Sequence, residues 1–200
     1  MATESVEVID VADRDRTVST LALAFAADPL IRWFWPDPHK YVTYWPRFVG
    51  AYGGRSFEHG SAHWLDGRAI ALWLPPGDEG GDDASLVELM IESLDAATLS
   101  DLGEMFGQMI ELHPTEEHWY LPVTGVDPAA QGRGMGTTVL RYGLALADRD
   151  GVPAYLEASS PRSRALYTRL GFELMDEIQA GSSPPVWAMI RQPGAVGTLV

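Results

Sequence analysis

The sequence contains no cysteine, and this absence excludes several kinds of chemistry at once. Disulfide bonds, thiolate metal sites and covalent cysteine intermediates all need a thiol. The five histidines also lack the HExxH spacing of a common zinc site, so we expect no metal. Any covalent chemistry in this protein must therefore use other side chains.

Basic residues are scarce, with 14 lysines and arginines against 28 acidic residues and a net charge of −14. A nucleic-acid partner needs a basic face, so we expect none. The chain also has no apolar run long enough to cross a membrane, and its N-terminus does not resemble a signal peptide. These absences predict a cytoplasmic protein with no membrane partner.

What is present is enough for one globular domain, because 46% of the 200 residues are hydrophobic. The most informative stretch is Gln131 to Gly136, which follows an apolar run and precedes a helical pattern. Three glycines allow a ligand to approach the backbone, and the start of a helix offers unpaired N–H groups to an anion. The alternative is an ordinary strand-to-helix turn.

Charge is unevenly distributed around this stretch. Residues 131–169 carry six arginines against three acidic residues, a local balance of +3 that leaves −17 for the rest of the chain. A phosphate-bearing ligand suits the basic segment, and a cationic second substrate suits the acidic remainder. The acidic excess is also explained by solubility alone.

Two common phosphate-binding motifs do not fit. The chain has no Gly-Lys pair for a P-loop, and Gly132, Gly134 and Gly136 break the GxGxxG spacing of dinucleotide-binding folds.

The remaining pattern predicts alternating strands and helices. Strands are expected at 6–11, 62–65, 68–74, 116–126, 152–158, 172–176 and 186–191, and helices at 18–25, 41–48, 85–112 (one broken or two consecutive), 137–149 and 163–170. Asp66-Gly67 predicts a hairpin turn, Ser85 to Glu88 a capping box, and Pro122 a bulge or splayed edge. We expect a single domain over residues 1–192 and a flexible tail over 193–200.

Aromatic residues gather between positions 33 and 48, around a segment at 31–36 that we interpret as a loop broken by proline. Each ring alone is best explained as core, but as a group they suit the wall of a substrate pocket. Trp33, Trp35 and, from the predicted hairpin, Trp73 are the candidate substrate-binding residues.

The segment from Trp119 to Phe172 resembles the acyl-CoA-binding core of the GNAT superfamily of N-acetyltransferases. The first matching motif is Val126-Asp127-Pro128 followed by Gln131, Gly134 and Gly136. The second is the strand from Tyr155 followed by Tyr167 and Gly171-Phe172. Within the superfamily, Phe25 to Pro29 and Pro161-Arg162 are similar to the puromycin N-acetyltransferase group.

The resemblance implies an α/β (α+β) fold with a mixed sheet of six to seven strands, helices on both faces, and splayed fourth and fifth strands. It also implies acetyl-CoA as acyl donor. The implied donor-binding residues are Thr124, Gly125, Val126, Gln131, Gly132, Arg133, Gly134, Met135, Gly136, Thr137, Ser163 and Tyr167. Many family members have asparagine where Ser163 stands. The resemblance places Tyr167 near the sulfur of CoA, where its phenol would protonate or steady the leaving thiolate.

Direct attack on the thioester needs a neutral amine, so a base must take a proton directly or through water. In the family that the chain resembles, the position of this base varies and a water chain can replace it. The candidates are Glu157, Glu116, Glu117 and His118. Glu157 ranks first because it is the only acid inside the fifth strand, although pairing with an arginine such as Arg162 would give it a structural role instead.

The leading hypothesis is an acetyl-CoA-dependent N-acetyltransferase acting on the amine of a small molecule, as a monomer or homodimer. The alternatives are acetylation of a peptide or protein amine and a non-catalytic acyl-CoA-binding regulatory protein.

Overall fold

The computed structural model describes residues 5–78 and 82–195. The predicted tail from 196 onward and residues 79–81 of the loop after the hairpin lie outside the described residues. No helix in the described ranges is long and apolar enough to cross a membrane.

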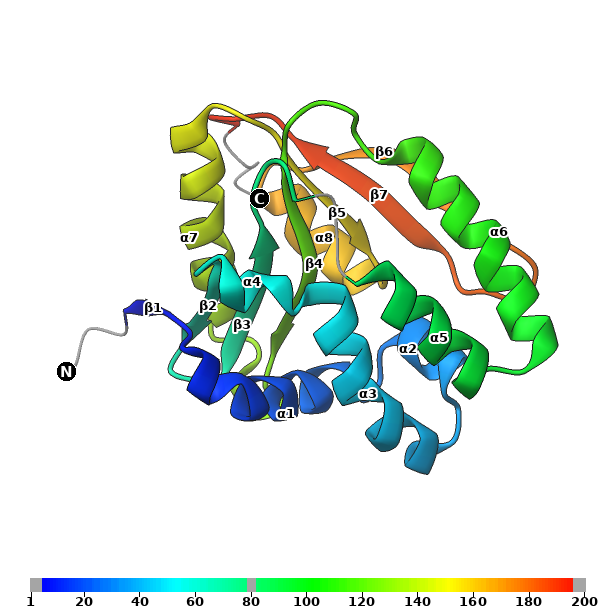
Figure 1. Ribbon diagram of the computed structural model, residues 1–200. Helices are drawn as coiled ribbons and strands as arrows, with labels where there is room; N and C mark the ends of the chain where they lie inside the picture. The colour runs from blue at the N-terminus through cyan, green and yellow to red at the C-terminus, as the bar shows by residue number, and fades with distance from the viewer. Residues whose placement is uncertain (1–4, 79–81, 196–200) are drawn as a thin grey trace.

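A seven-stranded mixed sheet forms the centre of the molecule (Figure 1). Its strand order is β1-β2-β3-β4-β5-β7-β6, and only β4 and β5 run parallel. The strands are β1 Val6–Val8, β2 Ala62–Leu65, β3 Ala69–Leu74, β4 Trp119–Val126, β5 Ala154–Ala158, β6 Glu173–Ile178 and β7 Val186–Arg191. The predicted mixed sheet with helices around it is therefore confirmed.

Alternating residues of β3 show how the helices cover both faces. Ile70 and Leu72 pack in the core cluster that includes α1 and α3, whereas Ala69, Ala71 and Trp73 pack in the cluster that includes α7. This alternation follows from side chains pointing to opposite faces along a strand. The helices are α1 Arg14–Phe25, α2 Pro29–Phe34, α3 Pro38–Gly53, α4 Arg55–Glu58, α5 Asp83–Ser93, α6 Ala96–Leu112, α7 Met135–Asp150 and α8 Pro161–Arg169.

The predicted hairpin and bulge are both present. Asp66 and Gly67 have φ of 54° and 62°, as a two-residue turn with both central residues in the left-handed region requires. The β3–β4 register shifts between Leu72 and Leu74, opposite the segment of β4 that holds Pro122. Pro122 has no N–H to give to the ladder, which explains the irregularity there.

Two local predictions are wrong. The helix predicted to begin at Ser85 starts earlier, at Asp83, because the Asp82 carboxylate accepts a hydrogen bond from the Ser85 N–H at 3.0 Å. The predicted aromatic loop at 31–36 is largely the short helix α2, capped by Asp28 with Pro29 in its first turn. Proline favours that position because its ring already has helical φ and its missing N–H would be unpaired there.

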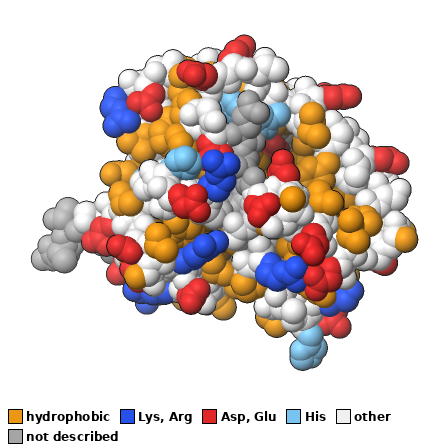
Figure 2. All heavy atoms as spheres, viewed as in Figure 1, with side chains coloured by type: hydrophobic (Ala, Val, Ile, Leu, Met, Phe, Trp, Pro, Cys, Tyr) orange, Lys and Arg blue, Asp and Glu red, His pale blue; other side chains and the backbone are white. Residues whose placement is uncertain are grey.

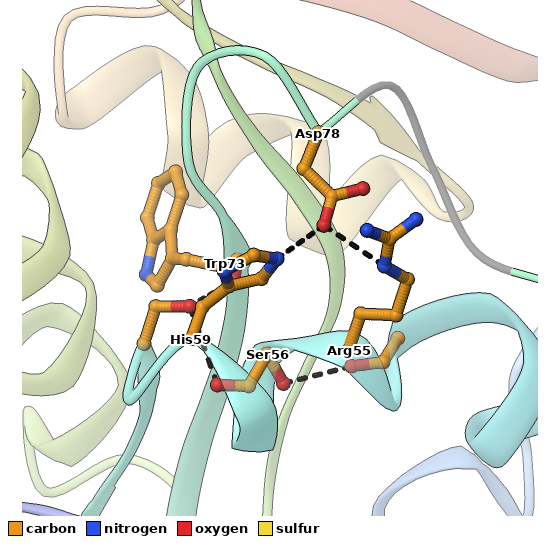
Figure 3. A network of polar contacts seen from close by, with 7 residues as sticks. Arg55, Ser56, His59, Trp73 and Asp78 are labelled. Carbon is orange, nitrogen blue, oxygen red and sulfur yellow. Dashed lines mark hydrogen bonds and ion pairs between the residues drawn. The ribbon is translucent and has the colours of Figure 1, made fainter.

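A polar network fixes the loop after β3 to α4 (Figure 3). The buried Asp78 carboxylate accepts from Arg55 Nε at 3.0 Å and pairs with His59 Nε2. Nearby, the Ser61 hydroxyl donates to the Trp73 carbonyl at 2.5 Å. The Asp78 contacts hold the loop beside α4.

Candidate active site

Strands β4 and β5 pair only where they begin. Trp119 lies opposite Ala154 and Tyr120 opposite Tyr155, and over the described residues no further pairs continue that ladder. Past Tyr120, β4 remains paired with β3 up to Val126. The strands therefore splay apart as predicted, and the β5-facing side of β4 is left available for a ligand backbone.

The glycine turn lies at the end of β4 and leads into α7. Gly132 and Gly134 have φ of 76° and 80°, in the left-handed region that favours glycine. A Cβ added at either position would meet no atom within 4 Å. Gly134 is the N-cap of α7 and provides no side-chain cap, so the first N–H groups of this 16-residue helix are available to an anion. The turn therefore fits a diphosphate.

Gly136 and Gly125 are explained by packing rather than by ligand access. A Cβ on Gly136 would lie 3.1 Å from Val126 Cγ2, and one on Gly125 would lie 2.8 Å from Ala24 Cβ. These glycines let α7 and α1 approach β4 closely.

Gln131 connects the glycine turn to α8 by hydrogen bonds. Its Nε2 donates to the Val126 carbonyl at 3.1 Å, and its Oε1 accepts from Arg162 Nη1 at 2.8 Å. Arg162 thus contacts Gln131 and not Glu157, so the alternative in which Arg162 neutralises Glu157 does not match the geometry.

Several predicted donor-binding side chains are already engaged. The Thr124 hydroxyl donates to the Ile70 carbonyl at 2.7 Å, and the Ser163 hydroxyl completes a capping box with Ser160. Met135 is buried in the core, whereas Arg133 is exposed and Thr137 half-buried. What this region offers a donor is mainly backbone N–H and C=O groups.

The basic segment is less concentrated at the turn than its sequence suggests. Arg149 pairs with Asp150 at the opposite end of α7, about 20 Å away at 1.5 Å per residue. Arg164 lies over the Trp187 ring, 5.3 Å from its centroid. On the face shown in Figure 2, acidic and basic side chains are interspersed.

Tyr167 is buried on α8 and packs edge-on against Phe172, with ring centroids 5.7 Å apart. Burial raises the pKa of its phenol, and the nearby Asp28 carboxylate raises that pKa further. The phenol therefore keeps its proton at neutral pH.

Asp28 is a residue of this region that the sequence reasoning did not assign to the site. One carboxylate oxygen caps α2 through the N–H groups of Leu30 and Ile31, and the other accepts from the Ser159 hydroxyl at 2.6 Å. Burial raises the pKa of Asp28 against the opposing effect of these hydrogen bonds. An aspartate directly before proline at a helix start is a cap signal that would have identified its local role.

Glu157 lies on β5 with some exposure remaining and accepts a hydrogen bond from the Tyr120 hydroxyl at 2.8 Å. Burial raises the pKa of its carboxyl to about 7, although the hydroxyls of Tyr120 and Tyr155 lower it. Over the described residues no lysine, arginine or histidine nitrogen lies within 4.0 Å of this carboxyl. A carboxyl poised near neutral pH is suited to accept a proton.

Two histidines lie beside the tyrosines that surround Glu157. His118 Nε2 lies 3.1 Å from His113 Nε2, and His118 Nδ1 contacts the Glu116 carbonyl at 2.8 Å. The His113 ring is 5.2 Å from the Tyr120 ring and 4.8 Å from the Tyr155 ring, measured between centroids. Burial, and then His118, lowers the pKa of His113 to about 4, so His113 is neutral at pH 7. The sequence reasoning named His118 but missed His113. Glu116 and Glu117 are exposed.

The three tryptophans proposed to bind substrate occupy different environments. Trp33 is half-buried on α2, packs against the cluster that contains Tyr120 and Tyr155, and donates to the Ser182 hydroxyl at 3.2 Å. Trp35 is fully buried among Phe34, Tyr44 and Phe48. Trp73 is fully buried on the opposite, α7-facing side of the sheet.

Residues 96–172 match the sequence profile of the acetyltransferase (GNAT) family. This segment runs from α6 through β4, the glycine turn, α7, β5 and α8. This part of the chain is similar to the GNAT family. The match leaves residues 1–95, with α1 to α5, outside the profile.

Two curated relatives align with part of this chain. An uncharacterized N-acetyltransferase of Schizosaccharomyces pombe is 27% identical over 64% of this chain and 58% of its own length. The mycothiol acetyltransferase of Beutenbergia cavernae is 36% identical over 54% of this chain and 30% of its own length. The chain thus matches less than two thirds of either relative.

Solved structures support the GNAT fold over nearly the whole chain. A protein described as histone acetyltransferase HPA2 and related acetyltransferase, from Corynebacterium glutamicum, has a TM-score of 0.65 and 26% identity over 98% of this chain and 99% of its own. The polyamine N-acetyltransferase of Drosophila melanogaster has a TM-score of 0.61 and 14% identity over 95% of this chain and 100% of its own. At that identity the second likeness shows the fold alone.

Proposed function

We propose that this protein transfers the acetyl group of acetyl-CoA directly to the amine of a small molecule. One observation carries the proposal: β4 and β5 separate after two residue pairs, with the glycine turn at the end of one strand and Glu157 on the other. This arrangement supports a donor-binding role for the turn and a base role for Glu157, since the two lie on the strands that separate.

The donor is proposed to bind along β4. Backbone N–H groups at Gly132 to Gly136, with the positive end of the α7 dipole, suit the pyrophosphate. Backbone groups of Thr124 and Val126 that β5 leaves unpaired suit the amides of the pantetheine arm, as an added strand would. Gly125 lies opposite Ile70 and the Asp127 N–H donates to the Arg68 carbonyl, so the backbone groups of Gly125 face β3. Because Gln131 occupies the Val126 carbonyl, we expect the N–H and C=O groups of Thr124 and the N–H group of Val126 to carry most of this recognition.

Acetyl-CoA, when bound, supplies a thioester carbonyl carbon and a sulfur leaving group. Glu157 is proposed to take one proton from the acceptor ammonium group, and the Tyr167 hydroxyl to give one proton to the departing sulfur. The neutral amine forms the nitrogen–carbon bond as the carbon–sulfur bond breaks, and the second proton that the nitrogen loses on becoming an amide returns to the Tyr167 oxygen through solvent. The two pKa directions suit these roles: Glu157 titrates near pH 7 and Tyr167 stays protonated.

The acceptor is proposed to lie on the α2 side of the sheet, where Trp33 packs against the cluster that contains Tyr120, whose hydroxyl donates to Glu157. Glu157 has no cationic partner among the described residues, so an ammonium group would compensate its charge. The puromycin N-acetyltransferase resemblance of Phe25 to Pro29 concerns this same acceptor side. It does not identify the amine.

The test is release of free thiol from acetyl-CoA, measured with and without a panel of small amines and with an N-terminal peptide amine. We expect release that depends on a small amine and is lost in Glu157→Gln. Release with the peptide alone would favour the peptide acetyltransferase. Tight CoA binding by calorimetry with no turnover on any amine would favour a binding protein and contradict the proposal.

A further inference from the structure

Two tyrosines connect α3 to Glu157. The hydroxyl of Tyr52, near the end of α3, is hydrogen-bonded to the hydroxyl of Tyr120 on β4. The Tyr120 hydroxyl also donates to Glu157 Oε2 at 2.8 Å. The Tyr52 and Tyr120 rings meet edge to face, with centroids 6.3 Å apart. A continuous hydrogen-bond chain therefore leads from a helix to the candidate base.

The direction of this chain is fixed when Glu157 is ionised. A carboxylate only accepts hydrogen bonds, and each phenol has one proton to donate. Tyr120 uses its proton toward Glu157, so Tyr52 must donate to Tyr120. Each phenol then polarises the next, and the last hydrogen bond is charge-assisted.

We propose that Tyr52 and Tyr120 are positioning residues that hold the Glu157 carboxylate in one orientation and favour its ionised form. This inference rests on the proposed role of Glu157 as base. Neither tyrosine belongs to the motifs that identify the donor site, and Tyr52 lies outside the segment that matches the family profile.

The side chains around Glu157 determine how its carboxylate is stabilised. Tyr120 and Tyr155 approach from β4 and β5, Tyr52 from α3, and His113 and His118 from the segment between α6 and β4. Burial raises the pKa values of all three tyrosines, and burial lowers that of His113 to about 4. The three tyrosines and His113 are therefore neutral at pH 7, and hydrogen bonds rather than opposite charge stabilise the carboxylate.

The position of Tyr52 links the base to the helical layer. Its ring stacks on Phe48, with centroids 5.2 Å apart, and the neighbouring Ala51 carbonyl accepts from the Asp82 N–H at 2.8 Å. Helix α4 follows α3 directly and carries Arg55, whose ion pair with Asp78 is drawn in Figure 3. A movement of α3 would thus displace the Tyr52 hydroxyl and change the hydrogen bond that Tyr120 donates to Glu157.

The direct test is a pH titration of the Glu157 carboxyl carbon by NMR in protein labelled with ¹³C-glutamate, the signal being assigned by its loss in Glu157→Gln. Tyr120→Phe and Tyr52→Phe are compared with Tyr44→Phe. Tyr44 lies on the same helix as Tyr52 but stacks on Trp35, so it is a matched control. We expect Tyr120→Phe to raise the midpoint by about one pH unit, Tyr52→Phe to raise it by less, and Tyr44→Phe to leave it unchanged.

The acid limb of kcat/KM should move in the same direction, so that Tyr52→Phe loses activity at pH 7 and recovers it near pH 9. A merely structural role would give a loss that is equal at both pH values. A Tyr52→Phe midpoint equal to that of Tyr44→Phe overturns the inference, even if Tyr120→Phe fails to fold. Full turnover in Glu157→Gln would instead contradict the role of Glu157 as base in the proposed function. The titration would still show whether Tyr52 and Tyr120 act on the Glu157 carboxyl.

Discussion

Tyr167 has the environment of an acid that keeps its proton until a strong base appears beside it. Its ring is buried against Phe172 and its pKa is raised by burial and by Asp28. We expect Tyr167→Phe to lower kcat by about 10-fold to 1,000-fold with little change in acetyl-CoA affinity. Steady-state kinetics together with calorimetric titration of CoA measure both quantities.

Unchanged kcat in Tyr167→Phe would remove the phenol from the reaction. A fall in CoA affinity equal to the fall in kcat would show instead that the phenol contributes to binding. The thermal unfolding midpoint of the variant serves as the control for the buried position.

At the residue scale, the sequence ranked Glu157 first among the bases because it is the only acid inside its strand. The structure adds its environment, which the sequence could not provide. Tyr52 and Tyr120 are 68 residues apart and meet only because α3 packs across β4. His113 follows a helix end and has no local pattern that distinguishes it from a surface residue.

The two ends of α7 allow a matched test of the glycine turn. Gly134 at its start and Gly151 at its end both have positive φ, 80° and 72°, and both have open space where a Cβ would lie. Valine at either position should cost on the order of 1–2 kcal/mol of unfolding free energy. Only Gly134→Val should also weaken CoA binding, by about tenfold or more, because a side chain would enter the anion site.

Calorimetry with CoA and urea unfolding of both variants check this prediction. Equal CoA affinity in Gly134→Val and Gly151→Val would mean that the turn does not hold the pyrophosphate.

A second element-scale prediction concerns the packing of α7 on β3. A Cβ on Gly143 would lie 2.1 Å from Trp73 Nε1 and 2.4 Å from Cε2 of the same fully buried ring. Gly143→Ala should therefore lower the free energy of unfolding by about 1–3 kcal/mol, despite the helix propensity of alanine.

Gly103→Ala on α6 is the matched control for this packing. The position is exposed and a Cβ there would meet no atom within 4 Å. Alanine should raise the free energy of unfolding by up to about 1 kcal/mol. Stabilisation by Gly143→Ala as well would show that Trp73 can move aside.

At the element scale, strong local signals predicted the structure well and weak ones did not. Asp66-Gly67 fixed a hairpin and Pro122 a bulge, because each restricts the backbone at its own position. The start of α5 was misplaced because several residues near 82–85 can cap, and the choice of Asp82 depends on how the loop packs. Helix α2 was missed because six residues carry too little periodicity to separate a helix from a loop.

For the whole molecule, buried titratable groups predict how stability depends on pH. Burial lowers the pKa values of His63 and His113 to about 4, below the unfolded value of 6.5, so their contribution is lost as pH falls from 6.5 toward 4. Burial raises the pKa of Glu157 from 4.5 to about 7, so its contribution is lost as pH rises through that range. The two effects oppose each other between pH 4.5 and 6.5.

Glu157→Gln removes the second effect. We expect the free energy of unfolding of this variant to depend more steeply on pH between 4.5 and 6.5 than that of the wild type, falling toward acid. Urea unfolding at half-unit pH intervals measures the slope, and identical slopes would contradict the assigned titration of Glu157.

The two residue pairs that join β4 to β5 have a further consequence for cooperativity. On one side of this junction β1 to β4 form a continuous ladder, and on the other β5, β7 and β6 form another. Side-chain contacts such as Ser159 with Asp28 and Arg162 with Gln131 connect the two parts beyond the junction. Amide hydrogen exchange can therefore divide the sheet into two units of different stability. A donor that bridges the strands would make these units exchange as one.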